Sequence, residues 1–119
     1  MTSDHRPTSQ NVQEAYGLLR HHVTQTPIVA HPTFQSASGT SLRIKAECLQ
    51  QTGSFKYRGA RYACMKAAEQ GATSVLAYSS GNHAQGIARA ARQLGMKATI
   101  IMPHDAPALK MQRVRDDGA

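Results

Sequence analysis

The stretch SVLAYSSGNHAQGIARAARQLGMKATIIM, residues 74–102, decides the fold of this 119-residue chain. Residues 74–78 form a short apolar run that a Ser-Ser-Gly turn ends, which is typical of a β-strand. Residues 82–94 repeat apolar side chains at helical spacing, and residues 97–102 form a continuous apolar run, which predicts a strand buried on both faces. These lengths predict a parallel βαβ connection and therefore an α/β fold. The helical side chains expected to face inward are Ile87, Ala88, Ala91 and Leu94.

Upstream, the sequence predicts a strand followed by a longer helix. Apolar residues alternate through 41–47, which is the period of a half-buried strand, and residues 51–54 then form a turn. Residues 55–70 are rich in Ala and long side chains, which favours a helix with Ser54 as its N-cap.

The N-terminal part predicts one more helix. Residues 11–22 carry apolar side chains at helical spacing, and Asn11 with Glu14 has the spacing of a capping box. Residues 28–29 then predict a short strand, and residues 32–37 predict a helical turn.

The charge of the chain does not indicate a nucleic-acid-binding protein. The formal net charge is +7, but Lys and Arg are spread singly along the sequence. Aromatic residues make up 5% and Trp is absent, which leaves few side chains for base stacking. The densest basic group falls on the helix predicted over 55–70, where Arg58 and Arg61 are expected to form a solvated face, with a role in bracing a site as the alternative for Arg58. We therefore expect no nucleic-acid partner.

The sequence also argues against a membrane or secreted protein. No segment approaches the roughly 20 apolar residues that span a bilayer, and residues 1–7 lack the pattern of a secretory signal. We expect a cytoplasmic protein with no membrane partner. Cys48 and Cys64 form no CxxC motif, so two reduced thiols and no metal site are expected.

Two stretches follow predicted strands and open predicted helices, which is where α/β sheets bind ligands. The first, residues 52–60, places Lys56 in the opening turn of a helix. The positive end of the helix dipole disfavours its ammonium form, and burial would act in the same direction. Both effects favour the neutral amine that forms a Schiff base. An exposed lysine with no special role is the alternative.

The second stretch, residues 79–86, supplies two hydroxyls, a glycine and an amide at a helix N-terminus. Unpaired backbone N–H groups at such a position bind carboxylates and phosphates. Gly81 allows the backbone to approach a ligand closely. An ordinary loop with a serine N-cap is the alternative.

Together the two stretches resemble a known family. SFKYRGA, residues 54–60, is similar to the cofactor-lysine motif of the fold-type II pyridoxal-phosphate (PLP) enzymes, in the branch of the threonine/serine dehydratases and serine racemases. SSGNHAQG, residues 79–86, is similar to their substrate-carboxylate loop, at the right distance downstream. The segments that extend the resemblance over nearly the whole chain are Thr26-Pro27, Lys45-Ala46-Glu47, Met102-Pro103 and Asp105-Ala106-Pro107 with Lys110.

The resemblance implies a role for each site residue. Lys56 would bond to the cofactor and move protons at the substrate α-carbon, with Phe55 beside the cofactor ring. Asn82 would hydrogen-bond the 3-hydroxyl oxygen of that ring. In the racemase branch, Ser80 would be the base on the opposite face of the α-carbon. The residues that would line the substrate-carboxylate site are Ser79, Ser80, Gly81, Asn82 and His83.

The resemblance further implies an enzyme that converts L-threonine or L-serine to a 2-oxo acid and ammonia by PLP-dependent β-elimination. Serine racemisation or a β-replacement is the alternative within the family, because dehydratases and racemases share the serine-rich loop. A truncated module without catalysis is a third possibility. The full-length protein is expected to be a homo-oligomer with an amino-acid substrate.

The chain is expected to be a fragment of the two-domain architecture typified by the tryptophan synthase β chain. After a helix predicted over 108–117 it ends with only two strands of a parallel sheet, and it has no glycine-rich phosphate loop. The resemblance places residues 1–71 in the large PLP-binding domain and residues 72–119 in the small α/β domain, both incomplete. The isolated chain is therefore expected to bind PLP weakly.

Overall fold

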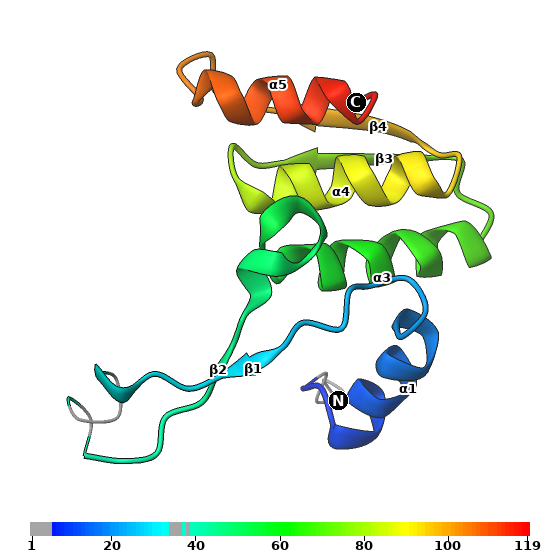
Figure 1. Ribbon diagram of the computed structural model, residues 1–119. Helices are drawn as coiled ribbons and strands as arrows, with labels where there is room; N and C mark the ends of the chain where they lie inside the picture. The colour runs from blue at the N-terminus through cyan, green and yellow to red at the C-terminus, as the bar shows by residue number, and fades with distance from the viewer. Residues whose placement is uncertain (1–5, 34–36, 38) are drawn as a thin grey trace.

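The computed structural model describes residues 6–33, 37 and 39–119. Figure 1 shows helices packed beside a two-stranded sheet, with an arm that extends away from them and carries a second strand pair. The elements are α1 (Ser9–Leu19), β1 (Ile28–Val29), β2 (Ile44–Lys45), the 3-10 helices η1 (Glu47–Leu49) and η2 (Gln51–Gly53), α3 (Lys56–Glu69), β3 (Ser74–Tyr78), α4 (Asn82–Gln93), β4 (Lys97–Ile101) and α5 (Ala108–Asp116).

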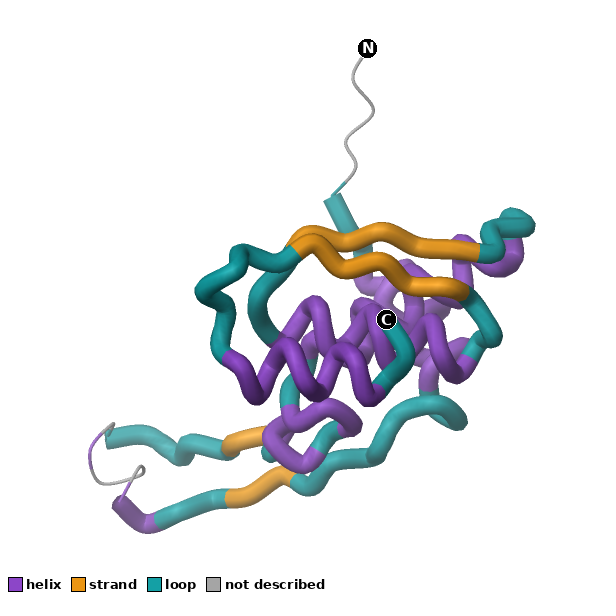
Figure 2. Tube along the Cα trace, turned by 90° about the horizontal axis from the view of Figure 1, so that it is seen from above, coloured by secondary structure: helices purple, strands orange, loops and turns teal. Residues whose placement is uncertain are grey.

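The predicted parallel βαβ unit is confirmed. Strand β3 pairs with β4 in parallel, with a register that runs from Ser74 opposite Lys97 to Tyr78 opposite Ile101. Helix α4 connects the two strands and packs against both. Figure 2 shows the two strands along one side of the molecule and the helices on the other side.

The prediction that residues 97–102 are buried on both faces is wrong for this chain. Burial alternates along both β3 and β4, so only one face of the sheet is covered. On the other face, Leu76 is 68% exposed and Tyr78 is 74% exposed, and Ile101 of β4 is exposed as well. The helices lie on the same side of the sheet, and nothing in the described part of the chain covers the opposite side.

The core lies where α3 packs against α4. Tyr57, Ala60 and Cys64 of α3 are buried against α4, which contributes Ile87 and a pair of alanines to the same cluster. Small residues on both helices permit this close packing. Of the inward-facing residues predicted for residues 82–94, Ile87, Ala88 and Ala91 are buried and Leu94 is partly buried.

The arm contains the short strand predicted over residues 28–29, and this strand pairs antiparallel with β2, a pairing that the sequence did not predict. Ile28 lies opposite Lys45 and Val29 lies opposite Ile44. The strand predicted over 41–47 is reduced to two residues, because Ile28 and Val29 are exposed and offer it no core to pack against. The helical turn predicted over 32–37 falls largely outside the described residues.

Two predicted helix starts are wrong in detail. Thr8, not Asn11, caps α1: its hydroxyl accepts a hydrogen bond from the Asn11 N–H at 3.2 Å, and the Asn11 side chain accepts one from the Thr8 N–H at 3.0 Å. At α3 the capping residue is Phe55, which has no side-chain acceptor. The hydroxyl of Ser54 is instead buried without a partner.

Candidate functional site

The two stretches singled out in the sequence meet where α3 passes α4. A methyl group on Gly86 of α4 would stand 3.0 Å from the Cβ of Ala60 and 3.4 Å from the carbonyl oxygen of Lys56. Because these distances are already tight for a real side chain, only glycine lets the two helices approach so closely here. The first turn of α3 and the first turn of α4 therefore lie next to each other.

A cavity of about 260 Å³ opens at this meeting point. Its lining residues are Phe55, Lys56, Gly59, Ala60 and His83. The cavity contains a primary amine, an aromatic ring and an imidazole, and both sequence stretches contribute to it. A larger cavity of about 310 Å³, lined in part by Thr52, Gln85 and Arg89, does not include Lys56. The chemistry of the side chains, rather than cavity size, identifies the smaller cavity as the candidate site.

Lys56 is the first residue of α3 and its side chain is exposed, so the burial considered in the sequence analysis does not occur. Its ammonium group lies 5.5 Å from the centre of the Phe55 ring, within the range of a cation–π contact. Among the described residues it makes no hydrogen bond or ion pair that would hold it away from a ligand. The amine is therefore accessible from the cavity.

The serine-rich loop between β3 and α4 forms a compact turn. The N–H of Ser79 donates to the carbonyl of Ile101 at 3.1 Å, and the N–H of Gly81 donates to the Ser79 hydroxyl at 3.2 Å. Gly81 occupies the N-cap of α4 and offers no side chain, so no side-chain acceptor caps this end of the helix. Asn82 and His83, the next two residues, are exposed. The N-terminus of α4 is thus open to an anionic group.

A cation also lies near this loop. The ammonium nitrogen of Lys110, from α5, is 3.8 Å from the point where a Cβ on Gly81 would stand. Lys110 was noted in the sequence only as part of the family resemblance, because a residue so far along the chain gave no signal of its position beside the loop. Its charge adds to the attraction of this region for anions.

The structure brings some of the predicted site residues together in the cavity, and the others do not line it. Phe55, Lys56 and His83 line the same cavity. The remaining predicted residues do not line this cavity: Ser79, Ser80 and Gly81 lie in the adjoining loop, and Asn82 is the first residue of α4.

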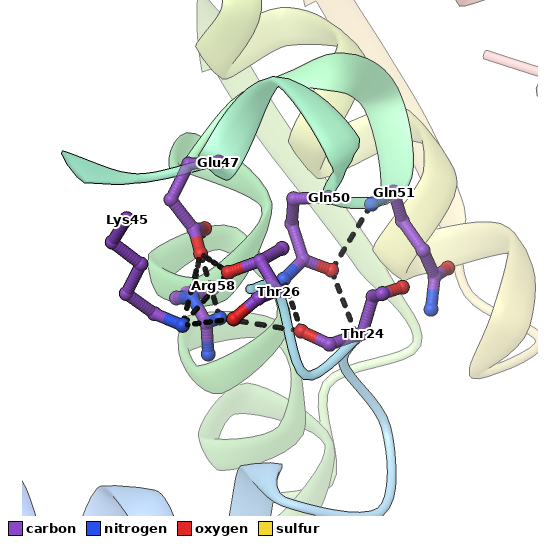
Figure 3. Close-up of polar contacts among 7 residues, drawn as sticks. All are labelled: Thr24, Thr26, Lys45, Glu47, Gln50, Gln51 and Arg58. Atoms are coloured by element: carbon purple, nitrogen blue, oxygen red, sulfur yellow. Dashed lines mark hydrogen bonds and ion pairs between the residues drawn. The ribbon is translucent and has the colours of Figure 1, made fainter. Parts of the chain in front are cut away.

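A partly buried ion pair that the sequence did not predict lies beside the site. Arg58 makes two hydrogen bonds of 2.8 Å to the carboxylate of Glu47, as Figure 3 shows. The Arg58 guanidinium holds the pKa of Glu47 at about 2, well below its usual 4.5, and the Thr26 hydroxyl adds to this effect while burial opposes it.

The prediction that Arg61 lies on a solvated face is wrong, because its side chain is buried. It is only 5% exposed, because His22 and the end of α4 cover it. Its guanidinium contacts the side-chain oxygen of Gln93 at 3.3 Å and a ring nitrogen of His22 at 3.4 Å.

The described residues show neither a metal centre nor a membrane-spanning helix. They contain no group of three or more His, Cys, Asp or Glu side chains that could hold a metal ion. None of the helices resolved within them is long and apolar enough to cross a membrane.

Comparisons with known proteins agree with the geometry. A family model described as "Pyridoxal-phosphate dependent enzyme" matches residues 19–119. An L-threo-3-hydroxyaspartate ammonia-lyase from a Pseudomonas species is 48% identical over 92% of this chain and 34% of its own length. The L-threonine ammonia-lyase of Thermotoga maritima is 39% identical over 94% of this chain and 28% of its own length.

The structural comparison gives the same result. The crystal structure of a pyridoxal 5'-phosphate-dependent aspartate racemase superposes with a TM-score of 0.88 at 37% identity, over 94% of this chain and 36% of that one. The chain therefore spans about a third of the length of the relatives that it matches.

Proposed function

The chain belongs to the family of pyridoxal-phosphate-dependent enzymes, and on this premise we propose that it carries the cofactor-lysine site of an enzyme that deaminates a β-hydroxy amino acid. The family is enzymatic, and its members here include ammonia-lyases. L-Threonine and L-serine are the proposed substrates, and the products are the 2-oxo acid and ammonia. The observation that carries the proposal is the cavity that Lys56 shares with His83, because it joins the two motifs in one site.

The residues present fit the cofactor. Lys56 offers an accessible primary amine that can bond to the aldehyde carbon of PLP, and Phe55 offers an exposed ring beside it. Two hydroxyl oxygens shortly before them, in Thr52 and Ser54, are buried without hydrogen-bond partners among the described residues. Buried hydroxyls without partners are uncommon in folded proteins, so they indicate a region shaped for further polar contacts. Asn82 would hold the ring hydroxyl from the start of α4.

The chemistry divides between the cofactor and the chain. PLP, when bound, supplies an electron-withdrawing ring that stabilises negative charge at the substrate α-carbon. The open N-terminus of α4 would bind the substrate carboxylate through the backbone N–H groups of its first turn, which begins at Asn82. The Nζ atom of Lys56 would take the α-proton, and binding at the loop would orient that proton toward it. Orientation of this kind contributes several powers of ten in rate.

Two other reactions are supported by specific observations. The 48% identity to a 3-hydroxyaspartate ammonia-lyase supports a substrate with a second carboxylate, for which Lys110 is a nearby cation. The superposition on an aspartate racemase supports racemisation, with Ser80 as the second base. Both remain alternatives to dehydration of threonine or serine, and all three use the same lysine and loop.

The experiment that tests the proposal is a titration of the purified chain with PLP, followed by borohydride reduction and peptide mapping. Wild-type protein is expected to carry the pyridoxyl label on Lys56 in preference to the other lysines. Lys56→Ala should lose that label, whereas the matched control Lys66→Ala, on the same helix, should keep it. Labelling spread evenly over all lysines would contradict the proposal.

Substrate choice is tested in the same preparation. L-Threonine, L-serine and L-threo-3-hydroxyaspartate would each be incubated with the PLP-loaded chain, and 2-oxo acid and product chirality would be measured. Formation of a 2-oxo acid supports deamination, and inversion at the α-carbon without a 2-oxo acid supports racemisation. A labelled chain that does neither would be the non-catalytic module.

A further inference from the structure

The first turn of α3 is held by an ion pair that reaches it from a different segment. The Nε and Nη2 atoms of Arg58 donate to the two carboxylate oxygens of Glu47, each at 2.8 Å. This two-pronged geometry fixes the direction of the guanidinium as well as its distance. Glu47 lies in η1, so the contact ties the turn containing Lys56 to a segment before it in the chain.

Glu47 is itself fixed by neighbours from two other segments. The hydroxyl of Thr26, which is buried, donates to the Glu47 carboxylate at 2.5 Å. Lys45 donates to the Thr26 hydroxyl at 2.7 Å and to the Thr26 carbonyl at 3.0 Å. Its ammonium group also lies 3.8 Å from the same carboxylate. We call these four residues, Thr26, Lys45, Glu47 and Arg58, the brace (Figure 3).

A second contact fastens the same segments together. The side-chain amide of Gln50 accepts from the Thr24 N–H at 2.9 Å and donates to the Thr24 carbonyl at 2.8 Å. Its oxygen also accepts from the N–H of Gln51 at 3.0 Å. Gln50 is buried, so these hydrogen bonds are shielded from water. The segment on which Glu47 sits is therefore unable to drift without breaking several contacts.

The residues at the start of α3 are held by different contacts. Tyr57 is fully buried in the core between α3 and α4. Lys56 makes no hydrogen bond or ion pair within the described residues, and Phe55 before it is exposed. Tyr57 thus fixes the side of the turn that faces the core. On the other side, Arg58 is held by two hydrogen bonds to Glu47 and by a longer one, 3.3 Å, from its Nη2 atom to the Thr24 carbonyl.

We propose that Glu47 is a positioning residue for Lys56: by holding Arg58, its carboxylate fixes the first turn of α3 and so the direction in which the Lys56 amine enters the cavity. This inference rests on the proposed function only for the role of Lys56. It predicts that removing the charge of Glu47 changes the reactivity of the Lys56 amine, although no contact joins the two side chains.

The variant that tests it is Glu47→Gln, which keeps the shape of the side chain and removes its charge. The matched control is Glu69→Gln, which breaks the exposed ion pair with Lys66 at the opposite end of the same helix. Glu47→Asp is the conservative variant, and it should recover part of the wild-type behaviour. Circular dichroism would establish that each variant folds, and Glu47→Asp would replace Glu47→Gln if the latter did not.

Two readouts follow from the proposal. Hydrogen exchange of the backbone amides in residues 54–59 should become about tenfold faster in Glu47→Gln, because local opening of the turn becomes easier. The fraction of pyridoxyl label on Lys56, relative to the exposed Lys97 of β4, should fall about tenfold, since a small displacement of a reacting group has large effects on rate. Glu69→Gln should change neither quantity at the start of α3.

The outcomes are separable. Unchanged exchange in residues 54–59 of Glu47→Gln would overturn the inference, whatever the labelling shows. Equal changes in Glu47→Gln and Glu69→Gln would also overturn it, because they would reflect general loss of helix stability. If wild-type protein itself shows no preference for Lys56, the proposed function fails, and the exchange measurement still decides the inference about Glu47.

Discussion

The hydroxyl of Tyr57 donates a hydrogen bond to the side-chain oxygen of Gln93 at 2.5 Å, and this contact ties the start of α3 to the end of α4. Gln93 also receives a hydrogen bond from Arg61 at 3.3 Å and donates one to Gln51 at 3.0 Å. One glutamine side chain therefore connects three segments that surround the core. The Tyr57 ring fills that core and is completely buried.

Tyr57→Phe is expected to lower the free energy of unfolding by about 1 kcal/mol, the typical cost of one lost hydrogen bond. Urea denaturation monitored by circular dichroism measures this change in the free energy of unfolding.

Burial raises the pKa of Tyr57, so its hydroxyl should ionise at a higher pH in the folded chain than in the unfolded chain. Absorbance titration should show one delayed tyrosine, which the variant lacks. The contribution of the neutral Tyr57 side chain to folding stability is complete below about pH 10, which is the pKa of tyrosine in the unfolded chain. It is lost as the pH rises through the higher pKa of Tyr57 in the folded chain.

Gly86→Ala is expected to destabilise the protein although alanine favours helices. The new methyl group would stand 3.0 Å from Ala60, and overpacking of about 1–3 kcal/mol outweighs a helix-propensity gain of about 1 kcal/mol. The urea midpoint should fall, and labelling of Lys56 by PLP should fall with it.

Gly17→Ala is the control for that substitution. Gly17 lies inside α1, and outside its own helix no described residue has an atom within 4 Å of the added methyl group, so stability should rise by up to about 1 kcal/mol. A Gly86→Ala protein as stable as Gly17→Ala would show that α3 and α4 can separate at no cost.

The brace makes stability depend on pH. Arg58 lowers the pKa of Glu47 from 4.5 to about 2, so its contribution is complete above pH 4.5 and is lost as the pH falls toward about 2. Glu47→Gln should therefore be less stable than wild type by about 1–2 kcal/mol at pH 7, because the side chain is partly hydrated. The difference should shrink below pH 4.5. A constant difference from pH 7 to pH 3 would contradict the ion-pair origin.

The two cysteines should react at very different rates. Cys48 is exposed, whereas Cys64 is buried in the core and burial raises the pKa of its thiol. With a disulfide reagent at pH 8, one thiol should react at once and the second only after unfolding. Cys48→Ser should remove the fast phase. A fast phase that survives in this variant would show that the core opens readily.

The sequence predicted the part of the fold whose signals are local. Residues 74–78 were predicted as a strand and form β3, and the helix predicted over 82–94 is α4, one residue shorter. Both rest on apolar periodicity and on turn residues at their ends. The strand predicted over 41–47 was wrong in length, because a strand persists only as far as its partner, and β1 offers two residues.

The candidate site was predictable only in its sequence motifs. The resemblance of residues 54–60 and 79–86 to known motifs identified Lys56 and the loop before α4, whereas position alone left an ordinary lysine and an ordinary loop as alternatives. In the structure, two 3-10 helices separate Lys56 from β2. The brace could not be predicted, because it needs Thr26, Glu47 and Arg58, three residues from separate segments, to meet. The burial of Arg61 was missed for the same reason, since its cover comes from His22 and from the end of α4.

The open face of the β3–β4 sheet has a consequence for the behaviour of concentrated solutions. Leu76 and Tyr78 form part of an exposed apolar patch that can associate with the same patch on another molecule. The net charge of +7 makes two molecules of the chain repel one another. Salt screens that repulsion over about 10 Å at 0.1 M and leaves the apolar attraction in place. Added salt is therefore expected to promote self-association of this chain, and low ionic strength should keep it dispersed.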